Sequence, residues 1–303
     1  MAQHFNYGGQ AVMEGVMIRG KKALAIAVRR PNGEIVTKIQ PLSSLYTGVL
    51  RNIPFVRGVI VLVETLALGV QALMYSANVS LEDEDVEVPS GMMWGTMAVA
   101  LVLAVGFFFV LPLLVMRGVG GLLPPTSVLS HVLEGLLRLA LFMLYIWGVG
   151  FVPDIKRVFA YHGAEHKAVN AFEHGAEMEV SKVQQFSTAH SRCGTAFVLV
   201  FFIIALIAFV LLGRSELLWE RLVWRIVLLP VIAAISYEII RFGARYGDNR
   251  IVSAIFSPSL ALQALSTRQP DDSQVEVAVH ALRAARDADG VPPSASAATP
   301  SNG

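Results

Sequence analysis

Four of the chain's seven histidines and its single cysteine lie between residues 162 and 193. On a helix, His162 and His166 are one turn apart and share a face, with Glu165 beside them. Two imidazoles at this spacing can bind one divalent ion, and a neighbouring carboxylate can take a proton from water. The order His-x-x-Glu-His is that of the inverted zincin motif. The pattern therefore predicts a metal site, with zinc as the favoured ion and Glu165 as a general base.

Further ligands have to come from outside this pair. Glu173 lies on the same predicted helix but about 10 Å farther along its axis than His166, so an unbroken helix excludes it. His190 and Cys193 are three residues apart, and imidazole nitrogen and thiolate sulfur are natural zinc donors. We therefore predict His162, His166, His190 and Cys193 as the ligand set.

The number of ligands decides what such a site does. Four protein ligands make a closed, structural site in which Glu165 only supports the ligands, whereas three leave a position open for hydrolysis. A third interpretation makes Cys193 a nucleophile with His190 as its base. The sequence leaves these three interpretations open.

The elements that hold these residues have the composition of a membrane protein. The chain of 303 residues is 54% hydrophobic and 16% charged, with a mean hydropathy of +0.58. Typical soluble domains are about 25% charged. The formal net charge is +1, and no basic tract is interleaved with aromatic residues, so nucleic acid is not an expected partner. No cleaved signal peptide is predicted, because the N-terminus lacks a basic segment followed by an apolar run.

Five segments follow one another along the chain. Residues 1–52 predict a small β-containing unit, because two extended stretches flank the turn signal Pro31-Asn32-Gly33. Residues 53–91 contain an apolar stretch, 53–78, that carries Glu64 and Gln71 and is followed by an acidic loop. That stretch is a membrane span, a re-entrant segment or an interfacial helix. Residues 92–245 form a transmembrane bundle, which includes the His-rich residues 153–193. Residues 246–288 form a C-terminal helical segment, and residues 289–303 a disordered tail.

Within the bundle, four stretches are long enough to cross a bilayer core of about 30 Å. They are Met92–Met116, Val128–Val152, Gly194–Leu212 and Leu222–Ile240. If 53–78 does not cross, nineteen Lys and Arg residues fall on the side of both termini and of 153–193, against four on the other side. This asymmetry places both termini and the metal site in the cytoplasm. We therefore predict a mainly α, polytopic helical membrane protein with about four transmembrane helices, one interfacial or re-entrant helix and a small N-terminal β element.

Helix boundaries are predicted at two further places. Asp154 is a suitable N-cap and Gly175 a suitable stop for a helix over 155–174 that carries the histidines. Asp271-Asp272-Ser273-Gln274 opens an amphipathic helix that runs to about Asp287.

Ionisable residues inside the apolar stretches mark functional sites by default. Glu134 and Arg138 are one turn apart and are expected to pair. Glu238 is expected to pair with Arg241 or Arg245. Glu64 has no basic partner in its own helix.

Several blocks of the chain resemble the YqhQ-like family of bacterial membrane proteins, which are usually described as predicted metal-dependent enzymes. The blocks are Gly8–Met17, Arg57–Val59 with Val63-Glu64, Tyr161–Lys167, His190–Thr195, Tyr237–Arg241 and Thr267–Gln274. Ser191 stands where proline is expected, which affects the rigidity of a turn more than ligation. The resemblance implies a bacterial inner-membrane protein with a metal site, and it supplies no substrate.

Two function hypotheses result. The first is a metal-dependent membrane enzyme, a hydrolase at the cytoplasmic membrane face, with His162, His166 and His190 as ligands and Glu165 as base. Its substrate is a lipid head group or a juxtamembrane peptide. The alternative is a non-enzymatic scaffold or transport accessory protein in which the metal only ties the predicted 155–174 helix to the 190–194 turn.

Overall fold

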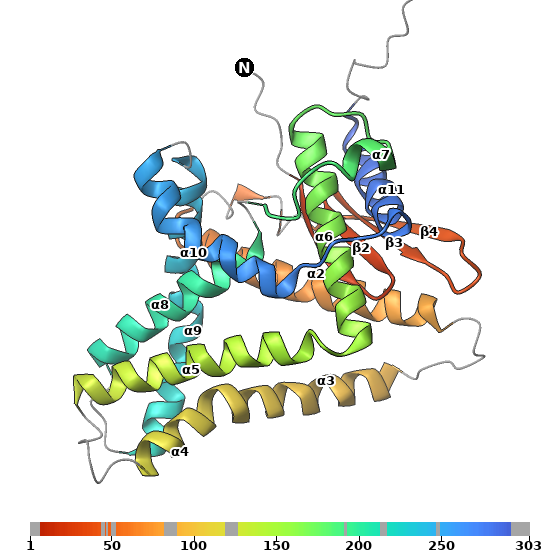
Figure 1. Ribbon diagram of the computed structural model, residues 1–303. Coiled ribbons are helices and arrows are strands. Elements are labelled where there is room, and N and C mark those ends of the chain that lie inside the picture. The colour runs from red at the N-terminus through yellow and green to blue at the C-terminus, as the bar shows by residue number, and fades with distance from the viewer. Residues whose placement is uncertain are drawn as a thin grey trace, which may run out of the picture.

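The computed structural model describes residues 7–43, 46, 48–49, 53–81, 90–118, 127–190, 193–212, 217–246 and 249–291. This part of the chain is mainly helical, with one small sheet near the N-terminus (Figure 1). The predicted acidic loop at 82–85 and all but the first three residues of the predicted disordered tail lie outside the described residues.

The sheet consists of four antiparallel strands in the order β1-β2-β3-β4. Their bounds are Gly8–Val12, Gly15–Arg19, Ala23–Arg29 and Ile35–Pro41. The predicted β-element is therefore confirmed, and the glycine-rich stretch before it adds two strands. Alternate side chains of β2 and β3 point to opposite faces, so each face carries its own apolar set.

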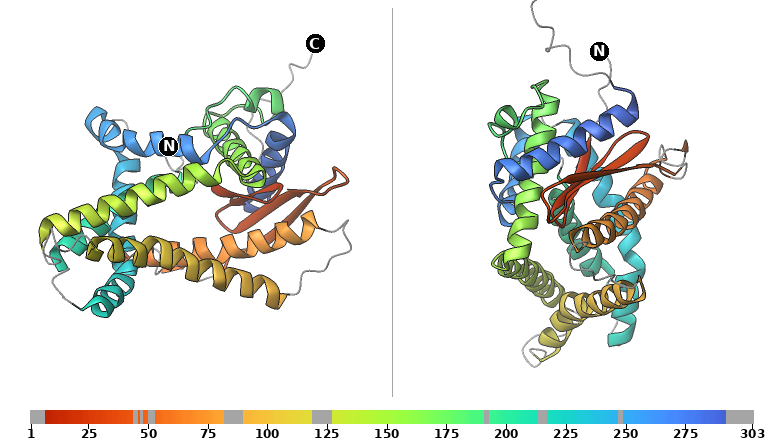
Figure 2. Two further views of the ribbon diagram at one scale, coloured as in Figure 1. Left: turned by 60° about the horizontal axis from the view of Figure 1, so that its bottom comes forward. Right: turned by 90° about the vertical axis from the view of Figure 1, so that its right-hand side faces the viewer.

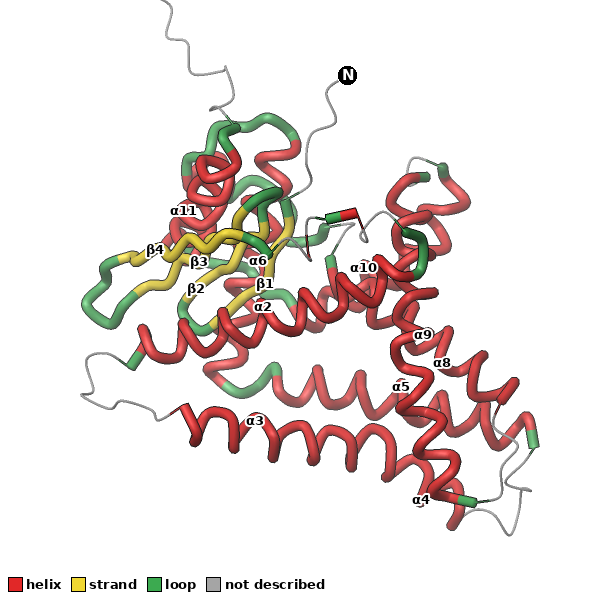
Figure 3. Tube along the Cα trace, turned by 180° about the vertical axis from the view of Figure 1, so that it is seen from behind, coloured by secondary structure: helices red, strands yellow, loops and turns green. Residues whose placement is uncertain are grey.

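Helices cover both faces of this sheet (Figures 2 and 3). On one face, Val16, Ile18 and Ala27 pack against α6 (Pro153–Glu173) and α11 (Asp272–Asp289). On the other face, Met17 and Ile26 pack against α2 (Val56–Ser80). The helix that carries the predicted metal motif is therefore fixed to the sheet by its apolar side.

Five helices in the described part of the chain are long and apolar enough to cross a membrane, which indicates a membrane protein. The four predicted spans are confirmed as helices. They are α3 (Ser90–Val105), which continues through a π-helical turn at Gly106–Val110 into α4 (Leu111–Gly118), then α5 (Val128–Val149), α8 (Gly194–Leu212) and α9 (Leu218–Arg245). The fifth is α2.

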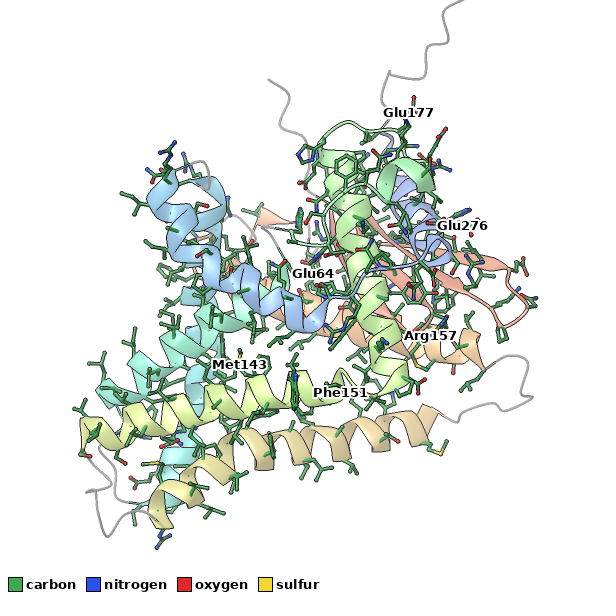
Figure 4. All side chains as sticks on the ribbon, viewed as in Figure 1. Glu64, Met143, Phe151, Arg157, Glu177 and Glu276 are labelled. Atoms are coloured by element: carbon green, nitrogen blue, oxygen red, sulfur yellow. The ribbon has the colours of Figure 1, made fainter. Side chains whose placement is uncertain are left out.

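In Figure 4, the labelled Glu177, Glu276 and Arg157 lie in the part that contains the sheet, α6 and α11, whereas Met143 and Phe151 lie with α5. The helix α10 (Arg250–Ser266) returns from the top of α9 toward α6, and a short α7 (Val180–Val183) lies beside α11.

The boundaries of α6 differ in part from the prediction. The helix begins at Pro153 with Val152 as its N-cap, so Asp154 lies in the first turn and does not cap. A proline at the first helical position lacks an N–H that would have had no partner there, which explains the earlier start. Gly175 ends the helix as predicted, with a φ of +68°. In α11 the predicted start is confirmed by a capping box between Asp271 and Gln274.

Ion pairs connect these elements. Glu134 and Arg138 pair as predicted, at 2.7 Å. The prediction for Glu238 is wrong, because its carboxylate bonds Arg57 of α2 rather than a basic residue on its own helix. Glu64 is buried against the sheet and accepts a hydrogen bond from Arg19 Nε of β2 at 2.9 Å.

Candidate metal site

The two histidines of α6 are oriented by backbone carbonyls of other segments. His162 Nδ1 lies 2.9 Å from the carbonyl oxygen of Ser266 at the end of α10, and His166 Nδ1 lies 2.5 Å from that of Thr188. A carbonyl only accepts, so each Nδ1 carries a proton, and in the neutral ring each Nε2 keeps a lone pair. Both rings therefore present Nε2 as a donor atom, in the tautomer that metal-binding histidines adopt.

Cys193 brings a third donor to the same place. It directly precedes α8, and its Sγ lies 3.4 Å from His162 Nε2. Ligand atoms of His162, His166 and Cys193 all lie within 4.8 Å of one another. A nitrogen and a sulfur that share a tetrahedral zinc ion are about 3.5 Å apart. The spacing of these atoms is thus suited to a common ion.

Glu165 lies beside this group. Its side chain is buried, and Oε2 is 3.6 Å from His166 Nε2. The carboxylate therefore reaches the donor atoms without being one of the three clustered ligands. This is a suitable position for a group that exchanges a proton with a water or substrate near the ion.

His190, the remaining predicted ligand, lies outside the three-residue group. Its ring centre is 5.7 Å from that of His166, and its Nε2 lies 3.3 Å from a carboxylate oxygen of Glu173. Glu173 is the last residue of α6, seven residues beyond His166. Its side chain thus contacts His190 in the loop that precedes Cys193. The loop folds back along α6 far enough for this contact, although the helix itself stays unbroken.

The loop before Cys193 is held by α6 side chains that bond its backbone. Lys167 Nζ donates to the carbonyls of Gln184 and Phe186 at 2.6 and 2.7 Å. Asn170 Nδ2 donates to those of Ser187 and Ala189. Burial lowers the pKa of Lys167, and its two carbonyl contacts supply acceptors for the ammonium group. Together with His166, one face of α6 fixes the path of residues 184–189.

Gln263 of α10 fixes the next step of the same loop. Its Oε1 accepts from the backbone N–H of His190 at 3.0 Å, and its Nε2 donates to the carbonyl of His190 at 2.8 Å. The side chain is almost completely buried. Gln263, Ser266 and Thr188 could not be predicted from the sequence. Ser266 and Thr188 act through a backbone carbonyl, which every residue has.

A close approach between α6 and the segment after α10 completes the frame. The backbone N–H of Arg268 donates to the carbonyl of Phe159 at 2.9 Å. A Cβ at Gly163 would collide with the carbonyl oxygen of Arg268. Glycine next to His162 therefore allows residues 267–270 to cross α6 in contact with it.

The donor set fits a divalent ion of the zinc type. Two imidazole nitrogens with lone pairs and one sulfur suit zinc better than magnesium or calcium, which take oxygen ligands. The backbone N–H of Thr195 donates to Cys193 Sγ at 3.4 Å and helps to orient the sulfur.

Comparison with known proteins shows which family this chain resembles. Residues 53–288 match a family described as a protein of unknown function (DUF1385). The chain is also 35% identical to "Uncharacterized protein YqhQ" of Bacillus subtilis (strain 168) over 289 residues, which cover 91% of each chain. No solved structure matches the chain.

Proposed function

This chain belongs to the DUF1385 family of proteins of unknown function, and from its own geometry we propose that it is a metal-dependent hydrolase acting at a membrane surface. The observation that carries the proposal is the arrangement of His162, His166 and Cys193, whose donor atoms converge while Glu165 lies 3.6 Å from one of them. Three protein ligands leave a fourth position open, as in catalytic rather than structural zinc sites.

Each side chain has a separate role in this proposal. His162, His166 and Cys193 hold the ion, and the carbonyls of Ser266 and Thr188 keep both rings in the required orientation. When bound, the ion supplies a Lewis acid that polarises a carbonyl or phosphoryl oxygen of the substrate. Glu165 takes a proton from the attacking water and returns it to the leaving group. His190 lies next to the ligands, with its ring centre 5.7 Å from that of His166.

The membrane arrangement is part of the proposal. One side of α2 packs on the sheet through Leu68, Ala72 and Val79, while Leu66 and Leu73 on its other side are exposed. A helix with these two faces suits the plane of the membrane interface better than a transmembrane position. With four spans, the Lys and Arg distribution then puts both termini and the site on the cytoplasmic side of the inner membrane.

The substrate class follows from this location. Cys193 directly precedes the apolar helix α8, and His162 lies about two and a half turns into α6, which follows the end of the apolar helix α5. We propose that the scissile bond belongs to a lipid head group or to a peptide segment close to the membrane.

The decisive experiment compares Glu165→Gln with the matched control Glu173→Gln in detergent-purified protein. Bound metal is measured by mass spectrometry, and hydrolysis is measured on phosphatidylglycerol and phosphatidylethanolamine vesicles and on fluorogenic membrane-anchored peptides. We expect about one zinc per chain in all three proteins, and a 10²- to 10⁴-fold loss of hydrolysis in Glu165→Gln only. If the wild type holds no more metal than His162→Ala/His166→Ala, the proposal is wrong.

A structural metal site is the second candidate, and the burial of His166 and Cys193 favours it. In that case the ion ties α6 to the start of α8. Glu165→Gln would then change nothing measurable, whereas Cys193→Ser and chelation would both lower the melting temperature.

A further inference from the structure

A second group of charged side chains is buried among the apolar helices. Glu134 and Arg138 lie on α5 and Arg225 on α9, with relative exposures of 3%, 4% and 3%. All three belong to candidate membrane spans. Ionisable groups in such positions are costly, so each of them needs a compensating partner.

One carboxylate serves both guanidinium groups. Glu134 Oε1 accepts from Arg138 Nη2 at 2.7 Å, and Glu134 Oε2 accepts from Arg225 Nη2 at 2.7 Å. Arg138 has a further acceptor, because its Nε donates to the carbonyl of Phe108 at 2.8 Å. Phe108 lies in the π-helical turn, where wider winding displaces carbonyls from the regular helix ladder.

Arg225 is less completely satisfied than Arg138. Its buried Nη1 lies 2.5 Å from Glu134 Oε1 as part of the ion pair, but makes no hydrogen bond to any described residue. Two guanidinium charges and one carboxylate leave a net charge of +1 on these three residues. The ring of His131, one turn before Glu134, bonds the carbonyl oxygen of Ser127 through Nδ1 at 2.8 Å.

Aromatic rings surround the excess charge. The ring of Phe209 on α8 lies 5.6 Å from Arg138 Cζ and 5.2 Å from Arg225 Cζ, and that of Phe109 lies 5.5 Å from Arg138 Cζ. The ring faces attract the cations but do not neutralise them. Among the described residues, no second carboxylate bonds either arginine.

From this imbalance we propose that Arg225, Arg138 and Glu134 form a membrane-embedded site for one singly charged anion. The anion accepts from the unsatisfied N–H of Arg225 and brings the net charge of the group to zero. The apolar rings favour a weakly hydrated anion, such as a larger halide, over a strongly hydrated or doubly charged one. A phosphodiester of an anionic lipid offers the same chemistry. This site is separate from the metal site and does not rest on the proposed hydrolysis.

The test uses the full chain in phosphatidylcholine nanodiscs, with gluconate as the background anion at constant ionic strength. Bromide replaces gluconate stepwise, and thermal unfolding is followed. We expect a saturable rise in melting temperature of about 5 °C at concentrations far above the dissociation constant. Sulfate should give no saturable rise. Nanodiscs that contain phosphatidylglycerol, in gluconate alone, test the lipid as the source of the anion.

Two variants assign the effect to the site. Arg225→Met should abolish the bromide dependence, whereas Arg57→Met, which also removes a carboxylate-paired arginine contacting α9, should keep it. If Arg225→Met does not fold, Glu134→Gln serves instead. Because both arginines are then unpaired, the melting temperature should rise half-maximally at a bromide concentration at least tenfold lower than in the wild type. Rescue by phosphatidylglycerol alone supports the site with lipid phosphate as its occupant. No saturable dependence on bromide or phosphatidylglycerol in wild type and Glu134→Gln would overturn the proposal.

Discussion

The candidate metal site and the buried charge group in the helix bundle are both polar clusters in a largely apolar chain, but they are held in different ways. At the metal site, backbone carbonyls accept from His162, His166 and Lys167, so the neighbouring segments do the positioning. In the bundle, the side chain of Glu134 is held by the side chains of Arg138 and Arg225. The first arrangement leaves donor atoms available for a ligand, and the second uses most of its hydrogen-bonding capacity internally.

This difference indicates different sensitivities. A cluster oriented by carbonyls depends on the path of several chain segments, so it should respond to changes in packing around it. A cluster held by mutual charge should respond most strongly when one charge is removed alone, since its partners then remain buried without compensation. Mutations can test each half of this contrast.

The largest effect is expected for Glu134→Leu in the absence of bromide and anionic lipid. The change leaves two buried guanidinium groups without their carboxylate, and breaking a buried ion pair costs about 3–5 kcal/mol. Chemical denaturation in detergent measures the loss. The triple variant Glu134→Leu/Arg138→Met/Arg225→Met should recover most of it, because apolar residues of similar volume replace the whole group. A triple variant as unstable as the single one would show that the charges are not the cause.

The next effect is expected for Gly163→Ala beside the metal site. Its Cβ would collide with the carbonyl oxygen of Arg268, so the crossing segment has to move, at a cost of about 3 kcal/mol. Gly135→Ala in the bundle is the matched control, because there the new Cβ meets the end of the Leu206 side chain, which can rotate away. Bound metal and melting temperature should both fall in Gly163→Ala. An equal fall of the melting temperature in Gly163→Ala and Gly135→Ala would mean that the metal site is no more sensitive to packing than the bundle.

A smaller effect is expected for Gln263→Leu. The change removes both bonds to the backbone of His190 while keeping a similar volume, so the loop that leads to Cys193 loses its anchor on α10. Supporting groups of this kind change metal affinity about 10- to 100-fold. Competition with a zinc-binding dye measures the affinity. Unchanged affinity in Gln263→Leu would mean that the loop is positioned by α6 alone.

The sequence predicted more of the helices than of the site. Four apolar stretches were long enough to be recognised individually, and Asp271 with Gln274 formed a local capping signal that needs no tertiary information. His162 and His166 also followed from helical spacing. The placement of His190 beside Glu173 did not, because it depends on the return of the 184–190 loop along α6. Likewise, the pairing of Glu238 with Arg57 arises from contact between α2 and α9, which periodicity within one helix cannot reveal.

The smallest effect is expected for Glu14→Gln, at the turn between β1 and β2. Glu14 accepts from Arg157 Nε and Nη2 at 2.6 and 2.5 Å and from Tyr161 Oη at 3.2 Å, so it links the sheet to the first turns of α6. The side chain of Arg157 is 55% exposed, and exposed ion pairs contribute at most about 1 kcal/mol. Chemical denaturation should therefore show a decrease in the free energy of unfolding of less than about 1 kcal/mol. The amount of bound metal should not change. Release of metal from Glu14→Gln would instead mean that the sheet positions the site through this contact, and that carbonyl contacts alone do not orient the histidines.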